Sequence, residues 1–345
     1  MIQTKAFQLI KNGAASEAFS LNEISLAEPK SDEVVIDVSA FGLNYADIMA
    51  RRGLYRECPP LPTVIGYEVV GTVSKVGGDQ QELIGKRVVA FTRFGGYSQK
   101  VITKVAAVAE IGELDAGKAL CLATQYVTAY YMSNYVTSIH KGERVLIHAA
   151  AGGVGTALIQ LVKHKGGEVF AKVGSEQKVD YLKELGVNKI VNYRIADYGD
   201  QLKELLQGER LDVSFNPSAG STFKKDFKLL GTGGRLVLFG GSERSGKKWG
   251  ILSTLNFVRK MGLVIPITLM MRSKNILGVN MLKIGDYKPE VLTHCLRQVV
   301  KMTLDGTLDP KVGGTFNAAD FVKAQEFLES GESTGKVVVV WNQDV

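Results

Sequence analysis

The sequence predicts an α/β protein in which a doubly wound parallel sheet is inserted into a β-rich domain made from both ends of the chain. Strand-like and helix-like segments alternate for about 140 residues after Glu143, as they do in such sheets. Within that region a glycine-rich turn joins the first strand to the first helix. Short strands and turns come before the region, and helices and one last strand come after it. We therefore expect one domain from residues 1–122 and 283–345, and a second from residues 123–282.

The N-terminal region alternates apolar runs with glycine and polar turns, which predicts β-structure. Its predicted strands are Lys5–Ile10, Glu33–Phe41, Glu68–Val76 and Arg87–Phe91. A short helix is expected within Gly42–Tyr55, and the prolines between residues 59 and 62 predict an extended loop after it. A helical region is then expected over Ala119–Met132.

The central motif of the chain is a strand, a glycine turn and a helix between Arg144 and Lys163. Arg144–Ala149 is almost entirely apolar and contains no turn former, which predicts a buried parallel strand. Gly152, Gly153 and Gly155 follow and precede an apolar-periodic helix. Missing Cβ atoms let the backbone approach a pyrophosphate, and a helix N-terminus offers N–H groups and a positive dipole end. The spacing A-x-x-G-x-x-G is a variant of the common dinucleotide fingerprint, so we predict a dinucleotide-phosphate site here.

The rest of the second domain continues the alternation. Its further predicted strands are Glu168–Val173, Lys189–Asn192, Leu211–Asn216, Arg235–Phe239 and Ile276–Met281, with helices such as Glu176–Leu185 and Tyr198–Gln207 between them. After Asp286 the sequence predicts helices Pro289–Leu304 and Ala318–Ser330 and a last strand, Lys336–Trp341. The apolar strand Ile276–Met281 should lie at a sheet edge, which proteins seldom leave bare. Pairing of two such edges across a two-fold axis leads us to expect a homodimer.

Composition narrows the class of protein. The 345 residues are 45% hydrophobic and 22% charged, which is typical of a globular protein. The three cysteines, Cys58, Cys121 and Cys295, lie far apart, which argues against a disulfide framework and a structural zinc site and favours a reducing compartment. We see no signal peptide and no apolar stretch of membrane-spanning length, so we expect a cytoplasmic protein. The net charge of +7 suits an anionic partner, but no basic run is interleaved with aromatic residues, so we expect no nucleic-acid partner.

Several motifs, taken in order, resemble one superfamily. They are GLNYADIMARRGLY from Gly42, GYEVVGTV from Gly66, TAYY from Thr128, HAAAGGVG from His148 and NYR from Asn192. This order resembles the medium-chain dehydrogenase/reductases, most closely the zinc-free quinone oxidoreductases and their vesicle amine transport protein-like branch. The resemblance covers nearly the whole chain. It implies a GroES-like β-rich catalytic domain, a Rossmann domain, and a nicotinamide cofactor in the cleft between them.

The end of the second Rossmann strand bears on which cofactor is used. NAD enzymes place an Asp or Glu there to bind the ribose 2′-hydroxyl. This chain has Gly174 and Ser175 at the turn, no acidic residue before Glu176, and Lys178 just beyond. The resemblance assigns the positions of Ser175, Lys178 and Tyr193 to a 2′-phosphate, so we expect NADPH, with Glu176 as the feature that fits least. The alternative is that Lys178 is a solvated helix lysine and Tyr193 a packing residue.

The resemblance also implies a substrate site. Asn44, Tyr45 and Tyr55 match positions that line the cleft in quinone oxidoreductases. Hydride transfer to a quinone or enone needs close approach and one hydrogen-bond donor to the developing enolate oxygen, which Asn or Tyr can supply. The expected catalytic residues are therefore Asn44, Tyr45 and Tyr55. The expected cofactor contacts are Asn44, Thr128, Ala151, Gly152, Gly153, Val154, Gly155, Gly174, Ser175, Lys178, Tyr193, Phe239 and Gly240.

Other roles remain open for some of these residues, and no metal is expected. Asn44 and Asp47 could cap the short helix, which we favour for Asp47, and the two tyrosines could be packing residues. Zinc alcohol dehydrogenases bind their catalytic metal through Cys and His in the two N-terminal motifs, where this chain has Asn44 and Tyr67. We expect His148 to be satisfied by one buried hydrogen bond and Glu68 to brace its domain.

These features together predict a zinc-free, NADPH-dependent oxidoreductase that acts on quinones or α,β-unsaturated carbonyl compounds. The alternative is an NADPH-binding membrane- or lipid-associated protein with little turnover. It is motivated by the segment Lys247–Lys274, which mixes basic residues such as Lys247, Lys248 and Arg272 with large apolar ones such as Trp249. We prefer to interpret this segment as a crossover that covers the sheet, because Pro266 interrupts any single amphipathic helix.

Overall fold

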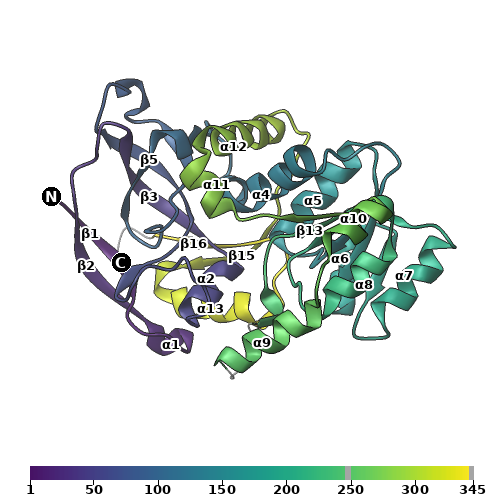
Figure 1. Cartoon of the computed structure of the whole chain (residues 1–345). Helices are drawn as coiled ribbons and strands as arrows, with labels where there is room; N and C mark the ends of the chain where they lie inside the picture. Colours follow the sequence, from purple (N-terminus) through teal and green to yellow (C-terminus); the bar gives the residue numbers. More distant parts are fainter. Residues whose placement is uncertain (245–249, 342–345) are drawn as a thin grey trace. The chain divides into compact units, whose positions relative to one another are not determined.

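The structure is a computed structural model that describes residues 1–244 and 250–341 (Figure 1). The chain forms two compact units, one from Met1–Val127 with Leu282–Val345 and the other from Thr128–Met281. The boundaries expected from the sequence lay after residues 122 and 282. Among the described residues, none of the helices combines the length and the apolar character that crossing a bilayer requires.

The first unit is built on antiparallel sheets. Its main sheet has the strand order β15-β16-β3-β5-β6-β8, with β7 paired to β3, and a smaller sheet has the order β2-β1-β4. The strands are β1 Ile2–Leu9, β2 Phe19–Leu26, β3 Glu33–Leu43, β4 Thr63–Val64, β5 Glu68–Val76, β6 Arg87–Phe91, β7 Lys100–Lys104, β8 Val108–Glu110, β15 Val312–Asn317 and β16 Lys336–Val340. The two ends of the chain meet here, because β16 lies antiparallel beside β3, with Val337 opposite Leu43.

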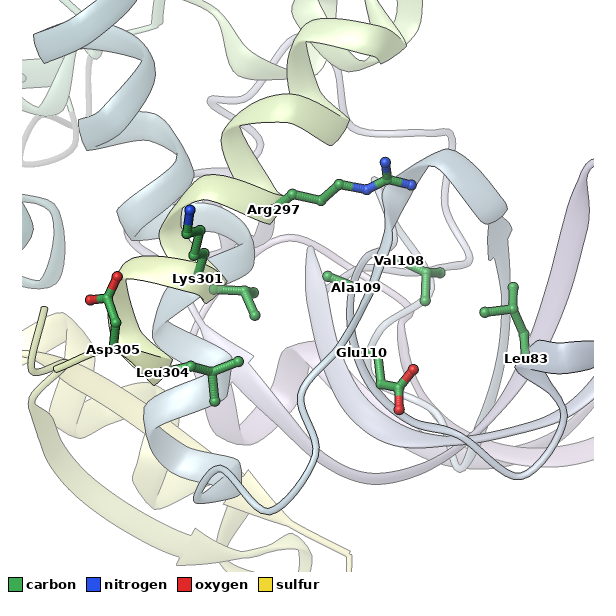
Figure 2. A pocket seen from close by; sticks show the side chains of 9 residues that line it. Leu83, Val108, Ala109, Glu110, Arg297, Lys301, Leu304 and Asp305 are labelled. Carbon is green, nitrogen blue, oxygen red and sulfur yellow. The ribbon is translucent and has the colours of Figure 1, made fainter. Parts of the chain in front are cut away.

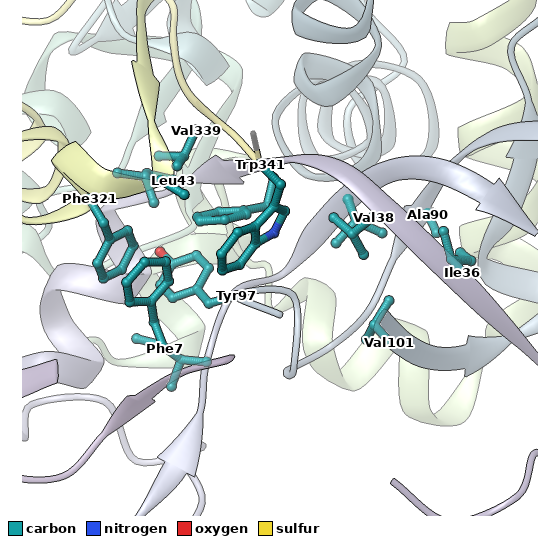
Figure 3. Packing of buried hydrophobic residues seen from close by; sticks show 14 of the residues in the cluster. Phe7, Ile36, Val38, Leu43, Ala90, Tyr97, Val101, Phe321, Val339 and Trp341 are labelled. Atoms are coloured by element: carbon teal, nitrogen blue, oxygen red, sulfur yellow. The ribbon is translucent and has the colours of Figure 1, made fainter. Parts of the chain in front are cut away.

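Helices and an aromatic cluster complete the first unit. The helices are α1 Ala15–Ala18, α2 Tyr45–Arg51, α3 Ala116–Cys121, α11 Met281–Tyr287, which begins at the boundary, α12 Pro289–Leu304 and α13 Phe321–Ser330. Phe7 stacks on Phe321 with ring centroids 4.2 Å apart and on Trp341 at 5.3 Å, so the core joins β1 to the C-terminal elements (Figure 3). Burial of such rings contributes about 25 cal/mol per Å² of apolar surface removed from water.

The second unit is a six-stranded parallel sheet with the order β11-β10-β9-β12-β13-β14. Its strands are β9 Arg144–His148, β10 Glu168–Val173, β11 Lys189–Asn192, β12 Leu211–Asn216, β13 Leu230–Leu238 and β14 Asn275–Gly278. Its helices are α4 Val127–Tyr130, which begins at the boundary, α5 Gly153–His164, α6 Glu176–Glu184, α7 Tyr198–Leu206, α8 Ser221–Leu229, α9 Gly250–Met261 and α10 Pro266–Arg272. The strand order reverses direction between β9 and β12, as in a doubly wound sheet. The predicted fold class, a β-rich domain plus a doubly wound parallel-sheet domain, is therefore confirmed.

Some predicted elements differ from the structure. The strand predicted over Ile276–Met281 is shorter, because β14 pairs with β13 alone among the described strands and ends where that pairing ends, at Gly278 opposite Leu238. Met281 instead begins α11. The strands β2, β4, β7, β8 and β15 were not predicted. The helical region predicted over Ala119–Met132 is present, but it contains π-helical turns at Leu122–Tyr126 and Tyr131–Val136. Pro266 does interrupt the predicted crossover, since α9 ends at Met261 and α10 begins at Pro266.

Candidate cofactor and substrate site

The glycine turn lies between β9 and α5, at the carboxyl edge of the parallel sheet. Ala149 follows β9 with a left-handed φ of 48°, which turns the chain toward the helix. A Cβ at Gly155 would lie 2.4 Å from the Ala149 oxygen and 2.6 Å from the Ala150 Cα, so only glycine lets α5 approach the strand this closely. In the first turn of α5, the N–H groups of Gly153, Val154 and Gly155 have no acceptor inside the helix. They are available to an anion, as a pyrophosphate site requires.

The ends of β10 and β11 form a second corner at the same edge. Tyr193 directly follows β11, and its N–H donates to the Val173 oxygen at 3.1 Å. Its ring packs on Gly174, where a Cβ would lie 2.4 Å from the tyrosine hydroxyl oxygen. Ser175 is the N-cap of α6 with extended backbone, and Lys178 lies in the first turn of that helix. Gly174, Ser175 and Tyr193 are thus brought together, with Lys178 on the adjoining turn and Glu176 exposed.

The remaining predicted cofactor contacts of this unit are Thr128, Ala151, Phe239 and Gly240. Thr128 and Ala151 are buried, and Phe239 is partly buried. Gly240 packs on the end of β12, because a Cβ there would lie 2.6 Å from the Pro217 oxygen. The glycine turn, the Gly174 corner and Gly240 therefore all lie at the carboxyl ends of strands, where ligands of doubly wound sheets bind. The close approach of α5 to β9 at Gly155 and the N–H groups of the first turn of α5 are the features that a dinucleotide site requires.

In the first unit, the side chain of Asn44 is held on both sides by buried partners. Its Nδ2 donates to Glu68 Oε1 at 2.7 Å, and its Oδ1 accepts from Lys336 Nζ at 2.9 Å. Lys336 also forms an ion pair with Glu68, and both side chains are fully buried. These three contacts fix which side of the amide carries the NH₂ group. One Nδ2 hydrogen remains beyond the one used by Glu68.

The ion pair between Lys336 and Glu68 crosses strand β3 above Gly42. In the order β16-β3-β5, Lys336 comes from β16 and Glu68 from β5. A Cβ at Gly42 would lie 2.3 Å from Lys336 Cε and 2.4 Å from Glu68 Oε1. Glycine at this position therefore makes room for the pair. The expectation that Glu68 braces its domain is confirmed, while Lys336 was missed, although a lysine opening the run of four valines was a visible signal.

Asp47 caps the short helix α2, as expected. Its Oδ2 accepts the backbone N–H of Asn44 at 2.7 Å. The side chain is completely buried, and burial raises its pKa to about 7, against the opposing effect of that backbone hydrogen bond. The structure thus gives Asp47 a positioning role beside Asn44.

Tyr45 and Tyr55 occupy different surroundings. Tyr45 opens α2 and is 40% exposed. Tyr55 is partly buried, lies edge-on to Tyr67 with ring centroids 6.3 Å apart, and has a pKa raised to about 12 by burial. Tyr67, which stands where a zinc alcohol dehydrogenase has its histidine ligand, is buried and also packs on Phe94 at 5.4 Å. Among the described residues no group of three or more His, Cys, Asp or Glu side chains is placed to hold a metal ion.

A cavity of about 600 Å³ lies in the same unit, away from Asn44, Tyr45 and Tyr55. Apolar side chains including Val108, Val300 and Leu304 line it, with Arg297 and Lys301 of α12 at its rim (Figure 2). None of the residues predicted for the cofactor or substrate lines it.

Comparison with known proteins identifies the family. Residues 30–128 match the model described as the alcohol dehydrogenase GroES-like domain, and residues 153–297 match the one described as zinc-binding dehydrogenase. The chain belongs to the medium-chain dehydrogenase/reductases. Within this superfamily it is related to the quinone oxidoreductases and to the VAT-1 homologues.

Several known proteins are similar to this chain over most of its length. The human synaptic vesicle membrane protein VAT-1 homolog is 28% identical over 315 residues, which are 90% of this chain and 80% of that protein. An Escherichia coli quinone oxidoreductase, solved in complex with NADPH, is 27% identical with a TM-score of 0.83 and covers 97% of this chain and 99% of that one. The JamJ enoyl reductase is 26% identical, with a TM-score of 0.85, and the match covers 99% of this chain and 100% of that protein. A polyketide synthase subunit of Mycobacterium tuberculosis is 29% identical, but the chain spans only 14% of its length.

Proposed function

We propose that this oxidoreductase is a zinc-free, NADPH-dependent enzyme that reduces quinones or α,β-unsaturated carbonyl compounds by hydride transfer. The observation that carries the proposal is the carboxyl edge of β9, β10 and β11. There a glycine turn lies beside a corner made by Gly174, Ser175 and Tyr193, where the end of β10 has no acidic residue and Lys178 lies in the first turn of α6. The E. coli quinone oxidoreductase complexed with NADPH supports the choice of cofactor.

The cofactor, when bound, supplies the hydride. The N–H groups of Gly153, Val154 and Gly155 would hold its pyrophosphate, and Ser175, Lys178 and Tyr193 would hold the 2′-phosphate. Thr128, Ala151, Gly152, Phe239 and Gly240 are proposed as the further contacts of the cofactor.

Asn44 is the best placed of the three proposed catalytic residues. Its amide is already oriented by Glu68 and Lys336, and one Nδ2 hydrogen remains for the oxygen of the substrate. A donor that is fixed before the reaction costs no reorganisation when negative charge develops on that oxygen. Tyr45 and Tyr55 offer hydroxyl groups for substrate binding. We propose that zinc has no part, because Asn44 is held by Lys336 and Glu68, and Tyr67 is a poor zinc ligand.

An assay of NADPH absorbance with a panel of quinones, enones, and simple aldehydes and alcohols tests this proposal. We expect consumption with quinones or enones, none with simple alcohols or aldehydes, and no loss of activity after treatment with a chelator. Asn44→Asp should lower kcat for the active substrate, since it replaces the donor by an acceptor. About one zinc per chain with activity lost to chelators would refute the proposal, as would activity confined to simple alcohols.

A second candidate function rests on another surface of the Thr128–Met281 unit. A cavity of about 850 Å³ there is lined by apolar side chains such as Phe227, Met261 and Leu263. Of the described residues that line it, five are basic and none is acidic; the basic ones are Arg210, Lys224, Lys228, Arg272 and Lys274. Basic and apolar side chains side by side suit an anionic lipid surface. The residues Lys247, Lys248 and Trp249, which helped to motivate this alternative, lie outside the described part of the chain.

Co-sedimentation separates the two candidates. Vesicles of neutral phospholipid, with and without about a third of anionic phospholipid, would be mixed with the protein at physiological salt. Retention by the anionic vesicles alone, lost in Arg272→Glu with Lys274→Glu, would support lipid association. We expect no retention and full turnover, because a crossover that covers the sheet also accounts for this surface.

A further inference from the structure

A row of buried polar side chains crosses the sheet just below the carboxyl edge of β9, β10 and β12. Asp226 of α8 accepts hydrogen bonds from Tyr198, Ser214 and Asn216 at 2.7 to 2.8 Å. Its Oδ2 also lies 2.8 Å from His148 Nε2, and His148 Nδ1 lies 3.2 Å from Lys172 Nζ. His148 ends β9 and Lys172 is the last residue but one of β10. His148 thus has two buried partners, where one was expected.

Within this row of buried polar side chains, His148 is neutral. Burial lowers the pKa of His148, so the imidazole stays uncharged. A neutral imidazole can carry its hydrogen on Nε2, toward the Asp226 carboxylate, and accept from the Lys172 ammonium at Nδ1. Burial would raise the pKa of Asp226, but His148, Tyr198 and Ser214 outweigh it and lower the pKa. The negative charge is therefore well satisfied.

The positive charge of Lys172 is less well satisfied. An ammonium has three N–H donors, and among the described residues this one has a single hydrogen-bond acceptor, His148 Nδ1. The Nζ atom otherwise lies over two aromatic rings, 4.1 Å from the centroid of Tyr198 and 4.9 Å from that of Tyr193. The residue is 8% exposed. Burying a charged lysine costs folding free energy unless the charge is paired or hydrogen-bonded.

The position of Lys172 suggests that partner. Tyr193 packs on Gly174 at the corner proposed for the 2′-phosphate, and it is 50% exposed. The ammonium of Lys172 therefore lies against a tyrosine ring that is half exposed at this corner. The cation attracts that ring and adds positive charge at low dielectric below the corner.

We infer that Lys172 is a positioning and electrostatic residue of the NADPH site, which fixes Tyr193 and supplies a buried positive charge toward the 2′-phosphate. This inference rests on the proposed use of NADPH. Lys172 of β10 would then be a second positive charge at this corner, in addition to Lys178 of α6.

The inference predicts a pH dependence. Burial lowers the pKa of Lys172 to about 8, with Lys225 acting in the same direction and Asp226 against it. An anionic ligand favours the charged form, so NADPH affinity should be greatest below about pH 8 and fall as the pH rises through that value. The 2′-phosphate itself is already fully charged there, since its second pKa is about 6. The charged and titratable groups around Lys172 are His148, Tyr193, Asp197, Tyr198, Lys225, Asp226 and Glu243.

The test is the dissociation constant of NADPH and of NADH between pH 7 and pH 9, measured by fluorescence titration. For the wild-type protein we expect NADPH binding to weaken about fivefold over this range and NADH binding to stay constant. Lys172→Met should weaken NADPH binding about tenfold at pH 7, remove the pH dependence and leave NADH nearly unchanged. Lys189→Met is the matched control, because its Nζ lies 4.8 Å from the Phe170 ring at the amino end of β11, and it should change neither constant.

Each contrary result has a distinct meaning. Equal losses for NADPH and NADH in Lys172→Met would show a merely structural role and overturn the inference, as would an unchanged NADPH preference. A flat NADPH profile in the wild-type protein would overturn it even if the variant failed to fold. A wild-type protein without any preference for NADPH would refute the proposed cofactor itself, and the inference with it.

Discussion

The amide of Asn44 is fixed by two charged side chains that the sequence places far from it. Glu68 and Lys336 are buried in the same unit and hold opposite ends of the amide. Asp47 holds its backbone N–H. Removing one member of a buried network leaves another charged or polar group without its partner, so single substitutions in it should have large effects.

At the residue scale, the first prediction concerns Lys178. A charge-assisted contact with the 2′-phosphate is worth roughly 1.5–3 kcal/mol, so Lys178→Ala should weaken NADPH binding roughly 10- to 150-fold. NADH lacks the phosphate, and its affinity should barely change. Fluorescence titration of both cofactors against the wild-type protein and the variant measures this. Equal shifts for the two cofactors, or none, would contradict the proposed role.

The raised pKa of Asp47 leads us to expect that the free energy of unfolding depends on pH. Its pKa of about 7 lies above the ordinary value near 3.9, so the folded chain binds this proton more tightly than the unfolded chain does. The resulting stabilisation is complete below about pH 4 and is lost as the pH rises to about 7. Asp47→Asn cannot ionise and keeps an oxygen for the Asn44 N–H.

Relative to this variant, the wild-type free energy of unfolding should fall by roughly 2–4 kcal/mol between pH 4 and pH 7. Urea unfolding of both proteins over that range measures it. Parallel profiles would show that Asp47 ionises normally.

At the scale of elements, strand β3 is built to let a salt bridge pass over it. Gly42 leaves the space in which Lys336 of β16 meets Glu68 of β5. Three neighbouring strands are thereby locked together by one buried pair. The same device recurs where α5 meets β9, since Gly155 leaves space for the backbone of Ala149 and Ala150.

Gly42→Ala should therefore destabilise the first unit. The added Cβ would meet both charged side chains, and separating a buried ion pair costs about 3–5 kcal/mol in the worst case; we expect a loss of about 2–4 kcal/mol in urea unfolding. Gly278→Ala is the control, because its strand position has open space and no left-handed φ, and it should change stability by less than about 1 kcal/mol. Similar small effects for both would mean that the pair relaxes freely.

At the scale of the whole molecule, the parallel sheet ends at a strand that, among the described residues, is paired on one side only. β14, Asn275–Gly278, has β13 as its neighbour within the chain. The segment before it exposes large apolar side chains, including Leu263 at 88%, Ile267 at 51%, Met270 at 70% and Met271 at 78%. An exposed edge beside an exposed apolar surface is a usual place for self-association.

We therefore predict a homodimer with this edge and surface buried. Light scattering at micromolar concentration should give about twice the chain mass of 37.4 kDa. Ile267→Asp with Met270→Asp should shift the mass toward the monomer. Leu304→Asp, at a residue of the other unit that is 59% exposed, should leave it unchanged. A wild-type monomer would contradict the prediction.

The sequence by itself determined the elements whose signal is local. The parallel strands Glu168–Val173, Lys189–Asn192 and Leu211–Asn216 occur at the predicted residues, because buried parallel strands are short apolar runs between turn formers. The glycine turn after β9 was predictable for the same reason, since a backbone approach requires missing side chains. Edge strands such as β2 and β14 were missed or misplaced, because their limits depend on a neighbour rather than on their own composition.

Only the tertiary structure decided which polar side chains are buried together. Lys336 meets Glu68 and Asn44 across 268 and 292 positions of sequence, and no local pattern links them. Nothing in the sequence around Lys172 distinguishes it from other strand lysines, and only the strand order places it between His148 and Tyr193. The physical reason is that burial and pairing set the charge and hydrogen-bonding capacity of a side chain, and both arise from the packing of distant segments.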